Sequence, residues 1–156
     1  MAREKKETDV PEHLKQNPIL QHLDIAELKK VVELSERKTY KAGDFVFKQN
    51  EAATKLYFVD KGRVGIIMQP TSTRQVTVST ESRGGVFGWS ALLHPRVYTA
   101  AAKCFEDCEL LALEGTKLRE LCYREPRLGV KVMEGLASLI AARLDSTRLQ
   151  LMDMWE

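Results

Sequence analysis

The spacing of hydrophobic and polar residues changes twice along the chain. Apolar residues recur every three to four positions over residues 9–37, alternate with polar residues over 38–114, and return to helical spacing over 115–156. Short alternating runs separated by turn residues are typical of the strands of a barrel or sandwich. The pattern therefore predicts a mainly β domain with helices before and after it.

The N-terminal helices are expected to begin at acidic residues that pair with a glutamate three positions later. Asp9 with Glu12, and Asp24 with Glu27, have the spacing of a capping box, in which two side chains satisfy free backbone N–H groups at a helix start. We expect a short first helix and a second helix that runs to about Arg37.

Several short runs in the central part of the chain have the alternation of strands. They are residues 38–49, 55–60, 63–69, 74–80, 97–104 and 108–115. Gly43 permits a tight bend, and Asp60–Gly62 has the composition of a hairpin turn. After the strands we expect a helix at 116–125, which ends before Pro126, and a longer helix from about Leu128 to the end.

The last helix has one long apolar stripe. Its members are Val132, Leu136, Ile140, Leu144, Thr147, Leu151 and Met154, at spacings of four and three residues. We expect the first part of the stripe to cover the β domain and the rest to continue past it. A stripe that extends beyond its own domain favours a second copy of the chain, so we expect a homodimer through this helix.

The composition is that of one soluble domain, expected at residues 9–156. The chain has 156 residues, of which 44% are hydrophobic and 29% charged, and a formal net charge of +2, which argues against a protein that mainly neutralises nucleic acid. Three cysteines without disulfide spacing favour the cytoplasm, and the three scattered histidines indicate no metal site. No apolar run has the length of a membrane helix. Residues 1–8 are charged and lack the apolar core of a signal peptide, so we expect them to form a mobile tail.

One loop between predicted strands has an unusual composition. Residues 84–102, GGVFGWSALLHPRVYTAAA, begin with two glycines, supply a third at Gly88 and continue through a short apolar turn to Pro95–Arg96. A glycine-rich approach to a short helix exposes unpaired backbone N–H groups, which attract an anion. The loop is therefore the candidate site for a small anionic ligand.

Several motifs follow one another in a recognisable order. They are YKAGDFVFKQNE, LYFVDKGRVGI, GGVFGWSALL and CELLALE, before the long last helix. In this order the chain resembles, over about residues 17–150, the cyclic nucleotide-binding domain of the Crp/Fnr regulators and the kinase regulatory subunits. The resemblance implies a β jelly roll with N-terminal helices and one long C-terminal helix. It also implies that residues 84–102 are the phosphate-binding cassette, with cyclic AMP or cyclic GMP as ligand and no cofactor.

The cassette departs from the family pattern at two positions. Members of the family place a Glu directly after the Gly, where it holds the ribose hydroxyl, and an Arg nine or ten residues later, which pairs with the cyclic phosphate. Trp89 stands at the Glu position, and its indole N–H cannot accept a hydrogen bond. The Arg position is Tyr98 when counted without a gap, or Arg96 if the loop is two residues shorter. On an extended segment, Arg96 and Tyr98 would point to the same face.

The residues that we expect to contact the ligand combine the cassette with one position of the last helix. They are Gly88, Trp89, Ser90, Ala91, Arg96, Val97, Tyr98 and Thr147. Trp89 either stacks on a ligand ring or fills a vacated pocket, and Arg96 is either an anion anchor or a solvated loop charge. By the resemblance Thr147 offers a hydroxyl to a bound base, whereas by its spacing it is a small residue in an apolar stripe.

The function that follows is a non-enzymatic regulatory sensor of a small anionic ligand. An Arg–phosphate bond is worth about 1.5–3 kcal/mol. Loss of this bond together with the Glu contact weakens cyclic nucleotide binding by about a hundredfold to ten-thousandfold, so we expect altered specificity. One alternative is a degenerate fold that acts as a protein interaction module. Another is the effector part of a Crp/Fnr-type transcription regulator. In the transcription regulators that this chain resembles, a winged helix-turn-helix follows the long helix and binds DNA. We expect none here, and therefore no DNA-binding domain and no direct contact with nucleic acid. We also expect no contact with a membrane.

Overall fold

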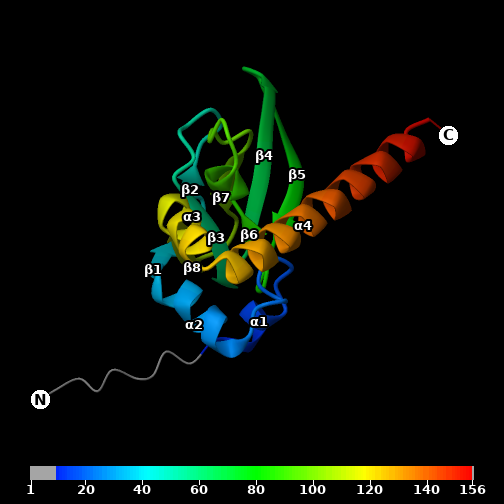
Figure 1. Ribbon diagram of the computed structural model, residues 1–156. Helices are drawn as coiled ribbons and strands as arrows, with labels where there is room; N and C mark the ends of the chain where they lie inside the picture. The colour runs from blue at the N-terminus through cyan, green and yellow to red at the C-terminus, as the bar shows by residue number, and fades with distance from the viewer. Residues whose placement is uncertain (1–9, 156) are drawn as a thin grey trace, which may run out of the picture.

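Antiparallel strands form the centre of the molecule, with helices at both ends of the chain. The structure, a computed structural model, describes residues 10–155 (Figure 1). The strands are β1 (Ser35–Tyr40), β2 (Phe45–Phe47), β3 (Lys55–Lys61), β4 (Val64–Thr71), β5 (Arg74–Glu81), β6 (Val86–Phe87), β7 (Ala101–Cys104) and β8 (Cys108–Glu114). The helices are α1 (Glu12–Lys15), α2 (Ile25–Glu33), the short 3-10 helix η1 (Trp89–Leu92), α3 (Gly115–Arg124) and α4 (Pro126–Asp153).

The strands form a jelly roll of two antiparallel sheets. One sheet has the order β1-β8-β3-β6, and the other has the order β2-β7-β4-β5. Only β4 and β5 are neighbours both in sequence and in a sheet, so the two sheets are built from strands that come from distant parts of the chain. This arrangement confirms the mainly β fold class, with flanking helices, that the alternating pattern and the family resemblance predicted.

Strand β3 lies between two hydrophobic cores. Leu56 and Phe58 belong to a core shared with the helices, whereas Tyr57 and Val59 belong to a core between the sheets. Successive residues of a strand point to opposite faces, so an unbroken apolar run is what a strand buried on both sides requires. The candidate loop follows β5 and pairs with this same strand through β6.

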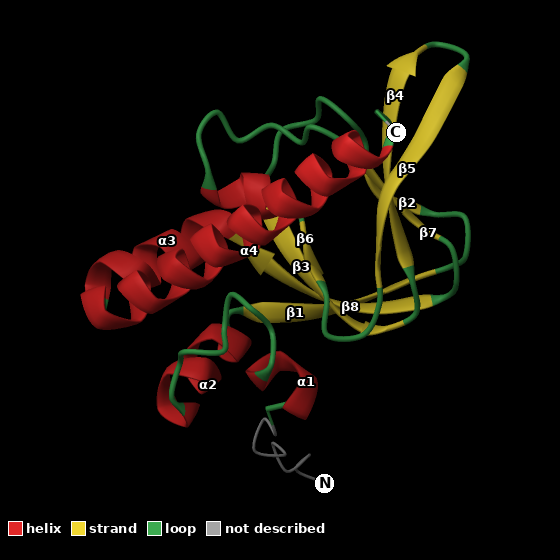
Figure 2. Cartoon of the chain, turned by 90° about the vertical axis from the view of Figure 1, so that its right-hand side faces the viewer, coloured by secondary structure: helices red, strands yellow, loops and turns green. Residues whose placement is uncertain are grey.

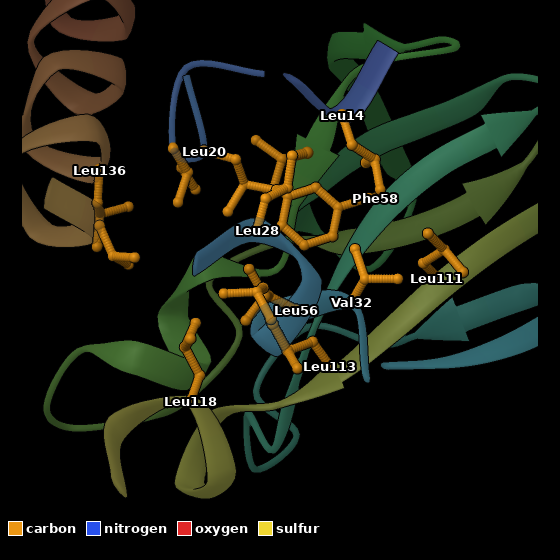
Figure 3. Close-up of a cluster of buried hydrophobic side chains, with 14 of the residues drawn as sticks. Leu14, Leu20, Leu28, Val32, Leu56, Phe58, Leu111, Leu113, Leu118 and Leu136 are labelled. Carbon is orange, nitrogen blue, oxygen red and sulfur yellow. The ribbon is translucent and has the colours of Figure 1, made fainter. Parts of the chain in front are cut away.

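The helices pack together over one face of the β1-β8-β3-β6 sheet. Figure 3 shows Leu14, Leu28 and Val32 from the N-terminal helices around Phe58, and Leu136 from α4 at the edge of the same cluster, beside Leu20. Leu118 from α3 and the strand residues Leu111 and Leu113 belong to this cluster too. Each of these side chains is buried. The N-terminal and C-terminal helices therefore share one core, which joins α4 to the sheet that carries the candidate loop.

Helix α4 contacts the body from its start to Arg143 and extends beyond it after that residue (Figures 1 and 2). A Cβ atom at Gly135 would lie 2.5 Å from the carbonyl oxygen of Pro18 and 2.7 Å from the Cα atom of Ile19, so the helix meets the N-terminal segment backbone to backbone. Of the predicted stripe, Val132 and Leu136 are buried, and the exposed members are Ile140, Leu144, Thr147, Leu151 and Met154. The predicted division of the stripe between the domain and the surface is confirmed.

The structure corrects the prediction near the N-terminus. Helix α2 ends at Glu33 and β1 begins at Ser35, so the helical region does not reach Arg37 and the jelly roll starts three residues before position 38. The capping box of Asp24 and Glu27 is confirmed, because each side chain accepts a hydrogen bond from the backbone N–H of the other residue. Pro11, not Asp9, precedes α1; Asp9 and the predicted tail at 1–8 lie outside the described residues.

The expected strand at 97–104 is also shorter than predicted. Strand β7 begins only at Ala101, because the preceding residues belong to the loop that follows η1. A two-residue strand, β6, which the alternation did not reveal, lies inside the glycine-rich loop and pairs with Tyr57 and Phe58 of β3. Through β6, the loop supplies one edge strand of the β1-β8-β3-β6 sheet.

Candidate ligand-binding site

Two glycines determine the path of the candidate loop. Gly84 and Gly88 have φ angles of +85° and +80°, in the left-handed region that glycine adopts most easily. A Cβ atom at Gly88 would lie 3.0 Å from the carbonyl oxygen of Lys55, so the loop passes close to the backbone of β3. The turn at Gly88 then leads directly into η1, whose four residues form only one turn of 3-10 helix.

The loop forms one wall of a small cavity between the jelly roll and α4. The cavity has a volume of about 90 Å³. Its lining residues are Phe47, Ile66, Ser79, Glu81, Phe87, Gly88, Trp89, Ser90, Tyr98, Thr99, Ala100 and Arg143. Of the sequence candidates, the structure thus brings together Gly88, Trp89, Ser90 and Tyr98. Two charged side chains that sequence reasoning did not select, Glu81 and Arg143, lie with them.

Tyr98 is packed firmly into the floor of the cavity. It is only 4% exposed, and its ring stacks on that of Phe47 with 3.5 Å between centroids and 6° between planes. The hydroxyl donates a hydrogen bond of 2.5 Å to the carbonyl oxygen of Lys55. Burial raises the pKa of Tyr98 above its ordinary value. Tyr98 therefore presents a neutral aromatic face to the cavity. When the loop is aligned without a gap, this is the position of the family's arginine.

Arg96 lies outside this cavity. Its φ of +55° is in the left-handed region, so the segment is not extended there, and the expectation that Arg96 and Tyr98 point to the same face is wrong. Arg96 is exposed and lines neighbouring surface hollows together with Arg119. If the loop is aligned with the family as two residues shorter, its arginine is Arg96, and this arginine lies away from the cavity that Trp89 and Tyr98 line.

The remaining sequence candidates surround the site without lining the cavity. Ala91 is buried, and its carbonyl oxygen accepts a hydrogen bond of 2.7 Å from Nη1 of Arg119. Val97 forms an isolated bridge with Ala52. Thr147 is exposed, and its hydroxyl donates a hydrogen bond of 2.9 Å to the backbone carbonyl oxygen of Arg143, one turn earlier in α4.

Arg143 reaches from α4 into the cavity and contacts three of its lining residues, two on β5 and one in η1. Its guanidinium group forms an ion pair with Glu81 at the end of β5 and lies 3.4 Å from the hydroxyl of Ser79. The same group lies over the indole ring of Trp89, 5.4 Å from the ring centroid. A cation over an aromatic face is attracted by the ring, so Trp89 and Glu81 hold Arg143 from two directions.

Glu81 is the buried acid of the site. The residue is 9% exposed, and desolvation raises the pKa of its carboxyl group, while the charge of Arg143 and its hydrogen bond act in the opposite direction. Because burial is the larger effect, the carboxylate form is less favourable here than in water. Only a weak indication in the sequence connects Glu81 with the site: it is the last residue of β5, shortly before Gly84 and Gly85 of the candidate loop.

We expect the stability difference between the wild type and a Glu81→Gln variant to depend on pH. Arg143 on α4 is the charged group that faces Glu81, and the other residues lining the cavity carry no charge at neutral pH. Because folding raises the pKa of Glu81, the unfolded chain ionises first as the pH rises above the ordinary value of 4.5. The wild type therefore loses stability relative to the variant until the pH passes the raised pKa.

Urea unfolding of both proteins across this range measures the effect. Comparing the two proteins cancels the contribution of the other carboxylates, which titrate in both. A difference that stays constant from about pH 4 to about pH 8 would contradict the raised pKa of Glu81.

The comparison with protein families identifies the domain. Residues 37–125 match the model of the cyclic nucleotide-binding domain. The chain belongs to this family. The matched segment contains the glycine-rich loop and every strand except the first two residues of β1, so the cavity described above lies in the part of the fold that defines the family. Cyclic nucleotide-binding domains are generally regulatory, not catalytic.

Relatives of this cyclic nucleotide-binding domain occur in proteins of different kinds. The chain is 30% identical to the cyclic AMP receptor protein of Thermus thermophilus over 138 residues, which cover 88% of this chain and 62% of the relative. It is 31% identical to Glutaminase 2 of Bradyrhizobium diazoefficiens over 141 residues, which cover 88% of this chain but 22% of the relative. The chain thus spans less than two thirds of the length of these relatives.

A solved structure supports the same assignment. The catabolite activator protein of Thermus thermophilus superimposes with a TM-score of 0.77 and 29% identity, over 88% of this chain and 63% of that protein. Within residues 10–155, no helix of the domain is both long and apolar enough to cross a membrane. The same residues contain no cluster of three or more His, Cys, Asp or Glu side chains that could hold a metal ion.

Proposed function

We propose that this chain is a non-enzymatic regulatory domain that senses a small anionic ligand of the cyclic nucleotide class, with altered specificity. One observation carries the proposal: Arg143 extends from α4 into a cavity whose opposite wall is the cassette residues Gly88 to Ser90. A ligand in this cavity contacts the cassette and α4 at once. Occupancy of the cavity and the position of the helix are therefore coupled, which is what a sensor requires.

The altered specificity follows from the aromatic residues in the cavity. Trp89 offers an indole N–H and a π face where family members have a carboxylate, and Tyr98 is neutral and bonded to Lys55. A ligand therefore loses the ribose acceptor and the charged phosphate partner of the common cassette. Stacking on Trp89 compensates for part of this loss, because aromatic contacts contribute about 0.5–1.5 kcal/mol.

The output of the sensor passes through a homodimer formed by α4. An exposed stripe with heptad spacing runs along the whole helix and supports this arrangement. It consists of Val130, Met133, Ala137, Ile140, Leu144, Thr147, Leu151 and Met154. Spacings of three and four residues in alternation are those of a coiled-coil seam. Arg143 precedes Leu144 of this stripe directly, so a shift of Arg143 also moves the proposed dimer contact.

Titration calorimetry with cyclic AMP and cyclic GMP tests the ligand class. We expect saturable binding below about millimolar ligand, and a two- to tenfold loss of affinity, roughly, in a Trp89→Leu variant. Trp155→Leu is the matched control, because Trp155 is exposed at the end of α4 and touches no part of the cavity. Absence of heat from a folded protein, with both nucleotides up to millimolar concentration, would count against a cyclic nucleotide sensor.

A second candidate function is an interaction module with a filled pocket. The cavity volume of about 90 Å³ favours it, because pockets for small ligands measure about 300–1,000 Å³. In this case Trp89 and Tyr98 permanently occupy the ligand space, and the stripe on α4 docks another protein. In either case we place the domain in the cytoplasm, without direct contact to nucleic acid. The third possibility, the effector part of a Crp/Fnr-type regulator, is supported by the match to the cyclic AMP receptor protein.

A further inference from the structure

The cavity contains two charged side chains among its lining residues, and they neutralise each other. Glu81 supplies the negative charge and Arg143 the positive charge. Arg96, the arginine within the cassette, lines other hollows. An anion that enters the cavity therefore meets a single cationic group along its walls, and this group already has an anionic partner.

We propose that Arg143 is the anion-binding residue of this cavity, and that a phosphate oxyanion binds by replacing Glu81 as the partner of its guanidinium group. This inference rests on the proposed sensing function and adds to it the residue and the exchange that make binding possible. Glu81 acts as an internal substitute for the ligand: it holds Arg143, and with it α4, in one position while the cavity is empty.

The geometry of Arg143 suits this exchange. A guanidinium group is planar, with its N–H donors along the edge, so it can stack on a ring and bind an oxyanion with its edge at the same time. Trp89 provides the ring, at 5.4 Å from the guanidinium carbon. The edge of the group faces Glu81 and Ser79. Exchange of one oxyanion for another keeps the stacked position and changes only the partner at the edge.

Accessibility indicates which partner moves. The side chain of Arg143 is 34% exposed, whereas that of Glu81 is 12% exposed. Arg143 extends from a helix that leaves the body after this point, while Glu81 is fixed at the end of β5. Arg143 can therefore turn from Glu81 towards an anion entering from solvent without unfolding the sheet. The buried carboxyl group that remains has a raised pKa and can take up a proton.

Titration with inorganic phosphate, followed by tryptophan fluorescence, tests this assignment. The chain has two tryptophans, so a Trp155→Phe background leaves Trp89, which lies under the guanidinium group, as the reporter. Glu81→Gln removes the internal competitor, and we expect about tenfold tighter phosphate binding. Arg143→Gln should abolish the fluorescence change. Arg148→Gln, in an exposed pair with Asp145 on the same helix, is the matched control and should bind like the background protein.

The outcomes separate this inference from the proposed function. Phosphate affinity that is unchanged in both Glu81→Gln and Arg143→Gln overturns the assignment. If Arg143→Gln does not fold, Arg143→Lys keeps the charge but loses the planar fork, and wild-type affinity in that variant overturns it equally. Cyclic AMP binding that survives Arg143→Gln supports the sensor and rejects the role of Arg143. Phosphate binding that follows the variants, without any cyclic nucleotide binding, supports the role of Arg143 and rejects the ligand class.

Discussion

Replacing Tyr98 with alanine should lower the free energy of unfolding by about 3–5 kcal/mol, the cost of truncating a buried aromatic side chain. The ring fills the floor of the cavity and stacks on Phe47, and its hydroxyl donates to the carbonyl oxygen of Lys55. The variant loses the contacts of the ring and leaves that oxygen without this donor. Urea unfolding followed by circular dichroism measures the loss.

A second variant at this position separates the contribution of the ring from that of the hydroxyl. Tyr98→Phe keeps the stacked ring and removes only the hydroxyl bond, so its cost should be about 1 kcal/mol. Tyr123→Ala is the matched control, because Tyr123 is exposed on α3 and should change the stability by less than about 0.5 kcal/mol. If Tyr98→Ala cost no more than Tyr123→Ala, the ring would not be a structural part of the cavity floor, and the ungapped alignment would lose its support.

The strands and turns of the β domain could be predicted from the sequence because their signals are local, whereas the jelly-roll topology followed from the family resemblance. Strand β3 alternates between two cores, and the turn after it depends on Gly62, whose φ of +91° only a glycine adopts easily. Asp24 and Glu27 likewise form their capping box within one helical turn. Features of this kind depend on neighbouring residues, so the sequence contains the information in readable form.

The site could be predicted only in part, because its charged residues come from distant segments. Glu81 and Arg143 are 62 positions apart, and neither stands in a motif that indicates the other. Gly88 was selected by the composition of the loop, whereas Trp89 and Tyr98 were selected by the family pattern that the loop resembles. Arg96 shows the limit of the argument from spacing: two residues two positions apart share a face only where the backbone is extended, and here φ is +55°.

The apolar stripe of α4 shows the same limit in a different way. A helix has 3.6 residues per turn, so positions separated by four and three residues drift slowly around the axis. From Leu136 to Leu144 there are two successive spacings of four, which together rotate the side chain by about 80°. Leu136 faces the body, whereas Leu144 faces solvent on the part of the helix that extends beyond the body (Figure 1). The spacing alone did not reveal that Val130 and Met133 continue the exposed side towards the start of the helix. Only the packing of the first half against the domain separates the two sides.

This division predicts opposite results for one substitution at two sites of the same helix. Leu136 is 2% exposed in the core that α4 shares with the N-terminal helices, so Leu136→Ala should destabilise the protein by about 2–5 kcal/mol at any protein concentration. Leu144 is 48% exposed, so Leu144→Ala should leave the stability of the monomer nearly unchanged. Its effect should appear in the dimer, as a lower sedimentation coefficient near the dissociation constant.

The two measurements together test whether α4 has a buried side and a side that contacts the second copy in the proposed dimer. Urea unfolding at several protein concentrations separates the stability of the monomer from that of the dimer, because only the latter depends on concentration. Equal destabilisation by both variants, independent of concentration, would contradict the separation of the helix into a buried and a partner-facing side. If Leu144→Ala weakens the proposed dimer alone, the exposed side of α4 forms the contact, and Leu144 on this side directly follows Arg143, which lines the cavity.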